Sequence, residues 1–255
     1  VIDLMIDEDY DFILGCGDNG YSDDDEWIDM FERFKSKFES AFGNHEYDDG
    51  VSNYRNFFGY SRTYNSFRFQ NVLIITIDSN ADENFPGWTT QINFLKSELE
   101  KYKDDTKVYW RIVAMHHAWF GNGGDHSPNE FDQVQKLHKI CTDYDVNFVM
   151  TGHNHHWVRT HQVSYNSSKP EEPHVVDSSS PYNKDNNGLI AIVSGTGGHD
   201  DPGDLYDLPD DDDFFAYRNN NHNGVFELVA SNNGKTLTGR FRDTNGDTHS
   251  SFTIE

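Results

Sequence analysis

Three short apolar runs, each followed by a polar segment, limit most strongly what this chain can fold into. Residues 72–77 (VLIITI), 108–115 (VYWRIVAM) and 146–150 (VNFVM) are rich in β-branched and aromatic side chains. The continuous apolar character of the first run indicates a strand that is covered on both faces. Amphipathic segments at 89–101 and 129–144 separate the runs and predict helices. This alternation of strand and helix is typical of a layered α/β fold.

The remainder of the chain predicts elements of both kinds. Residues 1–10 predict the end of a helix and a turn, residues 11–16 a short strand, and residues 23–38 a helix with a buried aromatic stripe. The second half predicts mainly strands, with turns of the Asn-Gly type between the last of them. These strands are expected at 190–193, 225–229, 237–241 and 251–254.

Two acidic segments of the second half have features of calcium sites. Residues 199–213 (HDDPGDLYDLPDDDD) are interrupted by proline and glycine, and we interpret them as a solvated loop, with calcium binding as the alternative. The segment Asp243-Thr244-Asn245-Gly246-Asp247 resembles the start of a calcium loop, but no glutamate follows at the required spacing. We therefore expect a hairpin turn there.

Length and charge narrow the range of functions. The 255 residues are enough for a full core, and we expect one domain over residues 1–255. With 20 basic and 44 acidic side chains the formal net charge is −24, which argues against nucleic acid or an anionic membrane as a partner. An anionic substrate would need bound cations that reverse the local sign of charge. No apolar run of about 18 residues is present, so we expect no membrane insertion.

Four polar stretches lie at or near the ends of predicted strands. Because the carboxyl ends of parallel strands meet at one edge of a sheet, the four stretches are expected to meet there. Carboxylate, amide, phenol and imidazole groups form a mixed ligand set, which suits two transition-metal ions better than one closed zinc site. The stretches are Gly17-Asp18-Asn19-Gly20-Tyr21, Gly43-Asn44-His45-Glu46, Met115-His116-His117 and Gly152-His153-Asn154-His155-His156.

The order of these motifs, Gly-Asp-x-x-Tyr, Gly-Asn-His-Glu, Val-x-x-His and Gly-His-x-His, resembles that of the calcineurin-like metallophosphoesterases. The tyrosine makes the chain similar to the purple acid phosphatases, in particular to the tartrate-resistant acid phosphatase type. The resemblance implies an α/β fold of four layers, in which a β-sandwich of two mixed sheets is flanked by helices. It also implies a metal-dependent phosphomonoester hydrolase, in which a metal-bound hydroxide attacks phosphorus with histidine assistance.

The resemblance further implies a dinuclear metal centre. Asp18 would bridge both metals, and Tyr21 and His155 would bind the first metal, normally ferric iron. The remaining ligands would bind the second metal, which is ferrous iron, zinc or manganese; a pair of manganese ions is the alternative. The full set of implied metal ligands is Asp18, Tyr21, Asn44, His116, His153 and His155.

Other histidines are assigned by their place beside the motifs. His45 follows the ligand Asn44 and cannot easily share its metal, so the resemblance implies a catalytic role at the phosphate. His126 falls close to a second phosphate-side histidine of the mammalian-type members, at a spacing from His116 that is one residue longer. His117 and His156 are expected to pack beside ligands. We assign no chemistry to His138, His161, His174, His199, His222 and His249.

One motif of the family is missing from the sequence. The family begins with a strand that ends in Asp-x-His or Asp-x-Gly, and the aspartate of this motif binds the first metal. No such motif precedes Asp18, and Asp3 is too close to Asp18 to leave room for a strand, a crossover helix and a second strand. We expect an incomplete sequence that lacks its first strand, because a natural deletion would leave backbone groups of the sheet unpaired.

Two other functions stay open at this point. The chain could be a phosphodiesterase or nucleotidase with two divalent ions, in which Tyr21 only packs. It could also be a non-catalytic structural or binding module that keeps the fold with a partial metal site. In the leading hypothesis the substrate is a phosphate-ester small molecule or a phosphoprotein, and the protein is secreted or extracytoplasmic. Cys16 and Cys141 are expected to be separate buried thiols, although a disulfide is the alternative.

Overall fold

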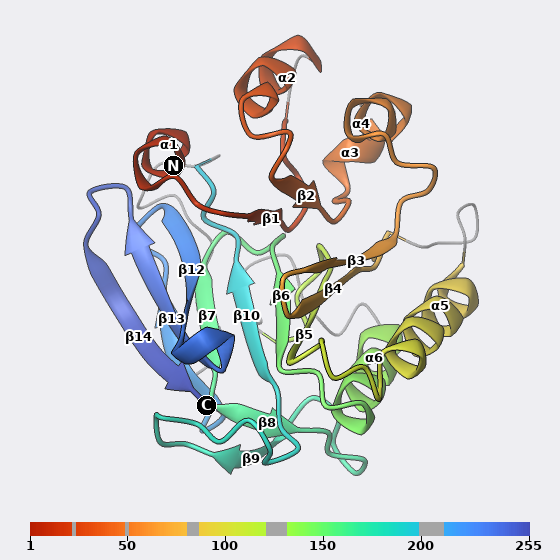
Figure 1. Cartoon of the computed structure of the whole chain (residues 1–255), viewed down its shortest axis with the longest axis vertical. Coiled ribbons are helices and arrows are strands. Elements are labelled where there is room, and N and C mark those ends of the chain that lie inside the picture. Colours follow the sequence, from red (N-terminus) through yellow and green to blue (C-terminus); the bar gives the residue numbers. More distant parts are fainter. Residues whose placement is uncertain (22–23, 49–50, 81–86, 121–131, 199–211) are drawn as a thin grey trace.

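A seven-stranded mixed sheet forms the centre of the molecule in the computed structural model (Figure 1). Its strand order is β11-β7-β10-β6-β5-β4-β3; the four strands from β10 to β4 are parallel, and β3, β7 and β11 pair antiparallel with their neighbours. The structure describes residues 1–21, 24–48, 51–80, 87–120, 132–198 and 212–255. The strands are β3 (Asn65–Phe69), β4 (Val72–Thr76), β5 (Trp110–Ala114), β6 (Phe148–Thr151), β7 (Trp157–Thr160), β10 (Ile190–Ser194) and β11 (Phe215–Asn219).

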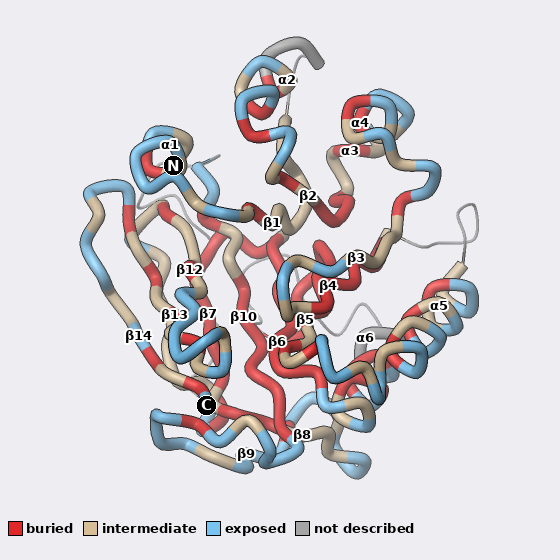
Figure 2. The backbone as a smooth tube through the Cα atoms, viewed as in Figure 1, coloured by how far each residue is buried: buried red, intermediate tan, exposed pale blue. Residues whose placement is uncertain are grey.

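The three apolar runs of the sequence become β4, β5 and β6, side by side in the middle of this sheet. Their residues are almost all buried, as the continuous red along the central strands of Figure 2 shows. A parallel strand inside a sheet is covered on both faces, so an unbroken apolar run is what it requires. The prediction of these strands is therefore confirmed.

Two helices cover one face of the sheet, α5 (Trp88–Lys101) and α6 (Asp132–Asp143). Leu95 and Leu99 of α5 and Leu137 of α6 are buried in one cluster with apolar side chains of β4 and β5. Both helices match the amphipathic segments predicted from the sequence, within the part of the chain that the structure describes.

A three-stranded antiparallel sheet covers the other face. Leu237 and Phe252 of this sheet pack against Trp110 and Phe148 of the central sheet. The turns predicted between its strands are confirmed: a short 3-10 turn at Asn232–Gly234 joins the first two strands, and residues 244–247 join the second and third. The strands are β12 (Gly224–Ser231), β13 (Thr236–Asp243) and β14 (Thr248–Ile254).

The N-terminal residues form a separate layer around an aromatic cluster. Trp27 stacks on Tyr54, with 4.0 Å between the ring centroids and 4° between the planes. The helix predicted over 23–38 is wrong at its end, because α2 stops at Glu32 and Phe38 instead begins a strand that pairs with Ile13. The elements are α1 (Ile2–Glu8), β1 (Ile13–Gly15), α2 (Asp24–Glu32), β2 (Phe38–Ser40), α3 (His45–Asp48) and α4 (Val51–Phe58).

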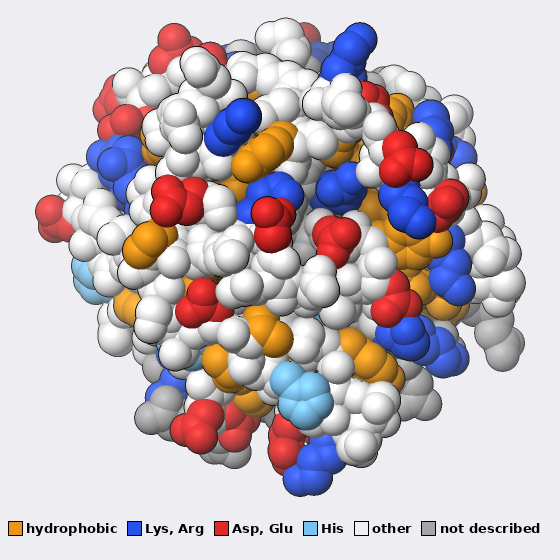
Figure 3. All heavy atoms as spheres, turned by 60° about the horizontal axis from the view of Figure 1, so that its bottom comes forward, with side chains coloured by type: hydrophobic (Ala, Val, Ile, Leu, Met, Phe, Trp, Pro, Cys, Tyr) orange, Lys and Arg blue, Asp and Glu red, His pale blue; other side chains and the backbone are white. Residues whose placement is uncertain are grey.

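The two layers of sheet and the flanking helices confirm the predicted α/β fold class. The second sheet differs from the mixed sheet that was expected, because β12–β14 are all antiparallel. Strands β1 and β2 form a separate parallel pair. A further antiparallel hairpin, β8 (Gln162–Ser164) and β9 (His174–Asp177), lies at the lower end of Figure 1. Figure 3 turns this end toward the viewer, where basic and acidic side chains are interspersed.

Several expectations concern single residues or segments. Cys16 and Cys141 are both free thiols, so the alternative of a disulfide is wrong. Burial raises the pKa of the Cys16 thiol to about 12.

Most of the acidic segment 199–213 lies outside the described residues. Within the described residues, no helix combines the length and apolar character that a bilayer crossing requires.

His138 on α6 is buried among Trp119, Phe120 and Tyr165, and neither of its ring nitrogens has a hydrogen-bond partner among the described residues. Burial lowers its pKa from 6.5 to about 3. The folded state therefore holds a neutral imidazole, whereas the unfolded chain binds a proton below pH 6.5. The free energy of unfolding therefore falls as the pH drops from about 6.5 toward 3. At pH 5 this residue lowers it by about 2 kcal/mol.

We expect His138→Leu to remove this acid sensitivity. Urea unfolding at pH 7 and pH 5 should show the variant gaining about 2 kcal/mol relative to the wild type at the lower pH. The matched control is His174→Leu, which replaces an exposed histidine of β9 and should leave the pH dependence unchanged. Parallel pH dependence of His138→Leu and the wild type would contradict the prediction.

Candidate metal centre

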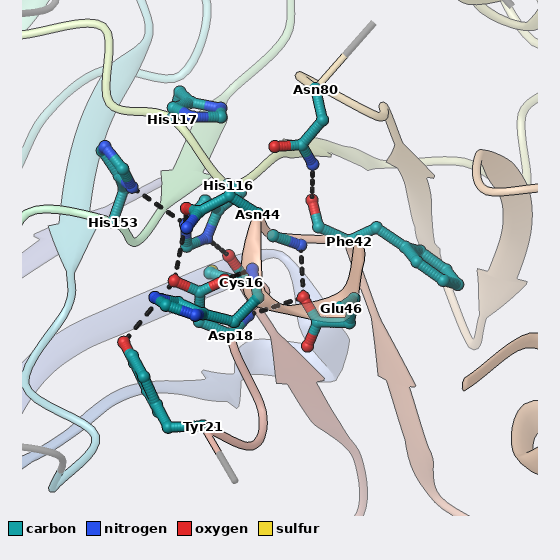
Figure 4. Close-up of polar contacts among 12 residues, drawn as sticks. Cys16, Asp18, Tyr21, Phe42, Asn44, Glu46, Asn80, His116, His117 and His153 are labelled. Carbon is teal, nitrogen blue, oxygen red and sulfur yellow. Dashed lines mark hydrogen bonds and ion pairs between the residues drawn. The ribbon is translucent and has the colours of Figure 1, made fainter. Parts of the chain in front are cut away.

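The carboxyl ends of five strands bring polar side chains to one edge of the molecule. Asp18 follows β1, Asn44 follows β2, Asp78 follows β4, His116 follows β5 and His153 follows β6. Because these strands run in the same direction within their sheets, their following loops converge. Figure 4 shows Asp18, His116 and His153 pointing toward one another.

The Nε2 atom of His116 is the centre of the first group of contacts. It lies 3.0 Å from Oδ2 of Asp18, 3.1 Å from Oδ1 of Asn44 and 3.0 Å from Nδ1 of His153. The ligand atoms of Asp18, His116 and His153 all lie within 4.8 Å of one another, which is close enough to share one metal ion. His116 itself is buried.

A second group of contacts shares Asp18 with the first. The hydroxyl of Tyr21 lies 3.5 Å from Oδ2 of Asp18 and 3.0 Å from Nε2 of His155. The ring of His45 lies against the ring of Tyr21, with 4.4 Å between the centroids, and its backbone N–H donates to Oδ1 of Asp18 at 3.0 Å. Asp18 therefore lies between a phenol and imidazole pair on one side and an amide and two imidazoles on the other.

The atoms around His116 fit a cation. Its Nδ1 lies 2.8 Å from the carbonyl oxygen of Cys16 and donates a proton to it, which leaves Nε2 with a lone pair directed at the cluster. In that tautomer Nε2, Oδ2 of Asp18 and Oδ1 of Asn44 are all acceptors. Two acceptor oxygens that each lie about 3 Å from an acceptor nitrogen repel it unless a positive charge lies among them.

The acid–base properties of the cluster agree with this argument. Burial raises the pKa of Asp18, but the His116 imidazole and the backbone N–H of His45 outweigh it and hold that pKa well below its usual range. Burial lowers the pKa of His116, but the Asp18 carboxylate outweighs it and raises that pKa. The electrostatics therefore favour a positive charge at this point.

Glu46 has a role that our sequence analysis did not assign. Its buried carboxylate accepts backbone N–H groups from Asp18 at 2.9 Å, Asn19 at 2.7 Å and Gly43 at 2.5 Å. One side chain thus joins the loop after β1 to the loop after β2, as Figure 4 shows for Asp18 and Glu46. The only trace of this role in the sequence is the glutamate of the Gly-Asn-His-Glu motif, which lies in the first turn of α3.

The same two loops approach too closely for side chains larger than glycine. A Cβ atom on Gly43 would collide with the carboxylate of Asp18, and one on Gly17 would lie 2.6 Å from the backbone nitrogen of Gly43. Gly17 also has φ of +88°, a backbone conformation that favours glycine. These two glycines allow the metal-ligand loops to lie in contact.

A second supporting network involves Asp78 and Asn80, which follow β4. The sequence did not indicate its contacts either. The buried carboxylate of Asp78 accepts hydrogen bonds from Tyr47 and Thr63, and Asn80 donates to the carbonyl of Phe42 at 3.0 Å. The contacts of Tyr47 and Phe42, on either side of Asn44 and His45, fix the segment that carries these two residues. Long-range contacts of this kind leave no periodic signal in a sequence.

The structure brings together all six of the predicted metal ligands, with His45 beside them. His117 packs on His153, with 4.4 Å between the rings, and its Nδ1 lies 2.7 Å from Oγ of Ser79. His126 lies outside the described residues. No Asp-x-His or Asp-x-Gly motif precedes Asp18 in the sequence.

The family model of the calcineurin-like phosphoesterases matches residues 1–157. The match covers more than half of the chain, so the chain belongs to the calcineurin-like phosphoesterase family. Purple acid phosphatase 18 of Arabidopsis thaliana is 27% identical to it over 146 residues, which are 57% of this chain and 30% of the relative. The resemblance to purple acid phosphatases found in the motifs is therefore confirmed.

Solved structures share the fold. Purple acid phosphatase PPD1 from yellow lupin (Lupinus luteus) seeds superposes with a TM-score of 0.76 at 20% identity, over 100% of this chain and 48% of that one. GAP50, the anchor in the inner membrane complex of Plasmodium, superposes with a TM-score of 0.64 at 13% identity, over 100% of this chain and 82% of that one. The chain spans about a third of the curated relative and about half of PPD1.

Proposed function

We propose that the protein is a metal-dependent phosphomonoesterase of the acid phosphatase type. The observation that carries the proposal is the arrangement of two groups of ligand atoms that share Asp18. Tyr21 and His155 lie on one side of this carboxylate, and Asn44, His116 and His153 on the other. Membership of the phosphoesterase family supports the same assignment.

In this proposal Asp18 would be shared by two metal ions. Tyr21 and His155 would hold the first ion, for which a phenolate and a carboxylate favour ferric iron. Asn44, His116 and His153 would hold the second, for which an amide oxygen and imidazoles favour ferrous iron, zinc or manganese. Bound ions would polarise phosphate oxygens, lower the pKa of water to about 7 and offset the formal charge of −24 near an anionic substrate.

Other groups at the centre orient a ligand or would contact the phosphate. The Cys16 carbonyl fixes the ring of His116 in the tautomer that leaves Nε2 free for a ligand. The ring of His45 lies tilted against that of Tyr21, and its Nδ1 lies 3.1 Å from the Asp48 carboxylate, which orients the ring. In the proposal this histidine stabilises the phosphate or protonates the leaving group, a role worth about 10²–10⁴-fold in rate. His126 is proposed as a second phosphate-side group.

A direct test combines metal location with activity. Crystals of the protein should give two anomalous-scattering peaks flanking the Asp18 carboxylate, and the same preparation should hydrolyse an aryl phosphate monoester. Two peaks without hydrolysis would favour a non-catalytic module that keeps the fold. The absence of both peaks in metal-supplemented protein would overturn the proposal. A phosphate-ester small molecule or a phosphoprotein is the proposed substrate, in a secreted or extracytoplasmic setting.

The role of Tyr21 separates this proposal from its nearest alternative, a phosphodiesterase or nucleotidase with two divalent ions. If Tyr21 binds ferric iron as a phenolate, the protein should be coloured, and Tyr21→Phe should abolish the visible charge-transfer band. The hydroxyl of Tyr21 lies 3.0 Å from His155, so the substitution removes a ligand atom and leaves the ring in place. A colourless wild type with two manganese ions would instead support the divalent alternative.

A further inference from the structure

Three potential metal ligands meet at one end of the three-stranded sheet and share no residue with the candidate centre. His222 precedes β12, Asp243 ends β13 and His249 lies in β14. Oδ2 of Asp243 lies 2.8 Å from Nε2 of His249 and 3.7 Å from Nδ1 of His222. All three ligand atoms lie within 4.8 Å of one another.

The carboxylate of Asp243 is held in a fixed orientation. Its Oδ1 accepts the backbone N–H groups of Asn245 at 2.9 Å and Asp247 at 3.0 Å, both in the turn between β13 and β14. Asp243 is only 2% exposed, so the backbone turn leaves Oδ2 directed at the two imidazoles. The segment that resembles a calcium loop in sequence thus uses its first aspartate to close a hairpin.

The two imidazoles stack on each other and are partly exposed to solvent. Their ring centroids are 4.1 Å apart with an interplanar angle of 27°. The side chain of His222 is 37% exposed and that of His249 is 23% exposed, whereas that of Asp243 is 3% exposed. A cation bound by Nδ1 of His222, Nε2 of His249 and Oδ2 of Asp243 would therefore have three protein ligands and a fourth position open to water.

The spacing of the ligand atoms fits a tetrahedral ion. Bonds of about 2.0–2.1 Å in tetrahedral geometry hold ligand atoms about 3.3–3.4 Å apart. The observed distances from Oδ2 of Asp243, 2.8 Å and 3.7 Å, lie on either side of this value, so shifts of about half an ångström would complete the site. Two imidazoles with one carboxylate form a ligand set that Zn²⁺ takes in proteins.

Arg242, the residue before Asp243, does not oppose a cation at this cluster. Side chains alternate between the faces of a strand, so Arg242 points away from the face that carries Asp243. Its guanidinium pairs with Glu8 of α1 at 2.6 Å and with Glu227 of β12 at 3.1 Å. The acidic character of the chain also raises the local concentration of cations.

We propose that His222, Asp243 and His249 bind a Zn²⁺ ion outside the dinuclear centre. The ion fastens the segment before β12 to the turn between β13 and β14, next to the backbone hydrogen bond from Thr244 to Asn223 at 3.0 Å. The ion also stabilises the start of β12, where the backbone N–H of Gly224 donates to the carbonyl of Thr196 in the segment after β10. The role of this site is to stabilise the second sheet.

The test compares zinc stoichiometry after equilibrium dialysis of wild type, His222→Ala and a matched control, His174→Ala. His174 is an exposed histidine of β9 with no place in either site. The wild type and the control should bind one more Zn²⁺ per chain than His222→Ala, and crystals soaked in zinc should show an anomalous peak beside Oδ2 of Asp243. Added zinc should raise the Tm of the wild type more than that of His222→Ala.

His222 is partly exposed and its Nδ1 lies 3.7 Å from Asp243, so its removal should leave the fold intact. His249→Gln is the second variant, because glutamine keeps a hydrogen-bond donor for Asp243 but removes the imidazole ligand. It should lose the same single ion. Equal stoichiometry in the wild type and both variants, or no anomalous peak at Asp243, would overturn the proposal.

Discussion

His153→Ala should lower kcat/KM for an aryl phosphate by about 10³-fold or more. Nδ1 of His153 lies 3.0 Å from Nε2 of His116, and the proposed second metal ion needs both imidazoles. A metal ion contributes several kcal/mol to the stabilisation of charge in the transition state, and about 4 kcal/mol corresponds to a factor of roughly 10³ in rate. The measurement is steady-state hydrolysis together with metal content, because the variant should lose activity and the second ion together.

The control for this experiment is His174→Ala, which replaces an exposed histidine of β9 that belongs to none of the motifs. It should keep the rate and the metal content of the wild type. Circular dichroism and urea unfolding establish that His153→Ala is folded. A folded His153→Ala protein with full activity would contradict the proposed function, since the side chain lies in the ligand cluster beside His116.

Glu46→Ala should lower the free energy of unfolding by about 4 kcal/mol. The carboxylate accepts three backbone N–H groups from two loops, and it is 1% exposed, so water does not replace it without rearrangement. A buried donor left without a partner costs about 1–3 kcal/mol. Because the loops carry Asp18 and Asn44, the variant should also bind metal more weakly. Urea unfolding and metal titration measure the two effects.

Glu46→Gln is the matched variant for this prediction. Glutamine keeps one carbonyl oxygen in nearly the same place, but its amide group opposes the N–H groups that the second oxygen accepts. Its loss of stability should therefore be smaller than that of alanine. Equal stability of Glu46→Ala and the wild type would show that the loops hold their positions without this side chain.

The central sheet could be predicted because its strands are buried on both faces. An apolar run rich in β-branched residues, such as 72–77, is what a strand buried on both faces requires, so local sequence was enough. The strands that were missed are short or lie near an edge of the sheet, as β3 and β7 do. The end of α2 was predicted wrongly because Phe38 is equally apolar in a helix and in a strand, and the pairing with β1 decides between them.

The candidate centre was predictable as a set of residues but not as a geometry. The convergence of loops after parallel strands indicated that the four motifs meet. The resemblance of their order to that of the family implied Asp18, Tyr21, His153 and the other ligands. Glu46 and Asp78 were not assigned, because their partners are backbone groups and side chains that lie far away in the sequence. The pairing of His222 with Asp243 was also missed, since it depends on the register of an antiparallel sheet.

The sequence by itself determined the layered α/β class, the β-rich second half and the chemical character of the ligand set. It did so because burial and strand direction leave local traces in the order of side chains. Tertiary structure alone decided which atoms face one another: Asp18 between two ligand groups, Glu46 across two loops, and Asp243 beneath two imidazoles. Such contacts form between segments that meet only in the folded chain, where distances of 3 Å arise from packing rather than from spacing along the sequence.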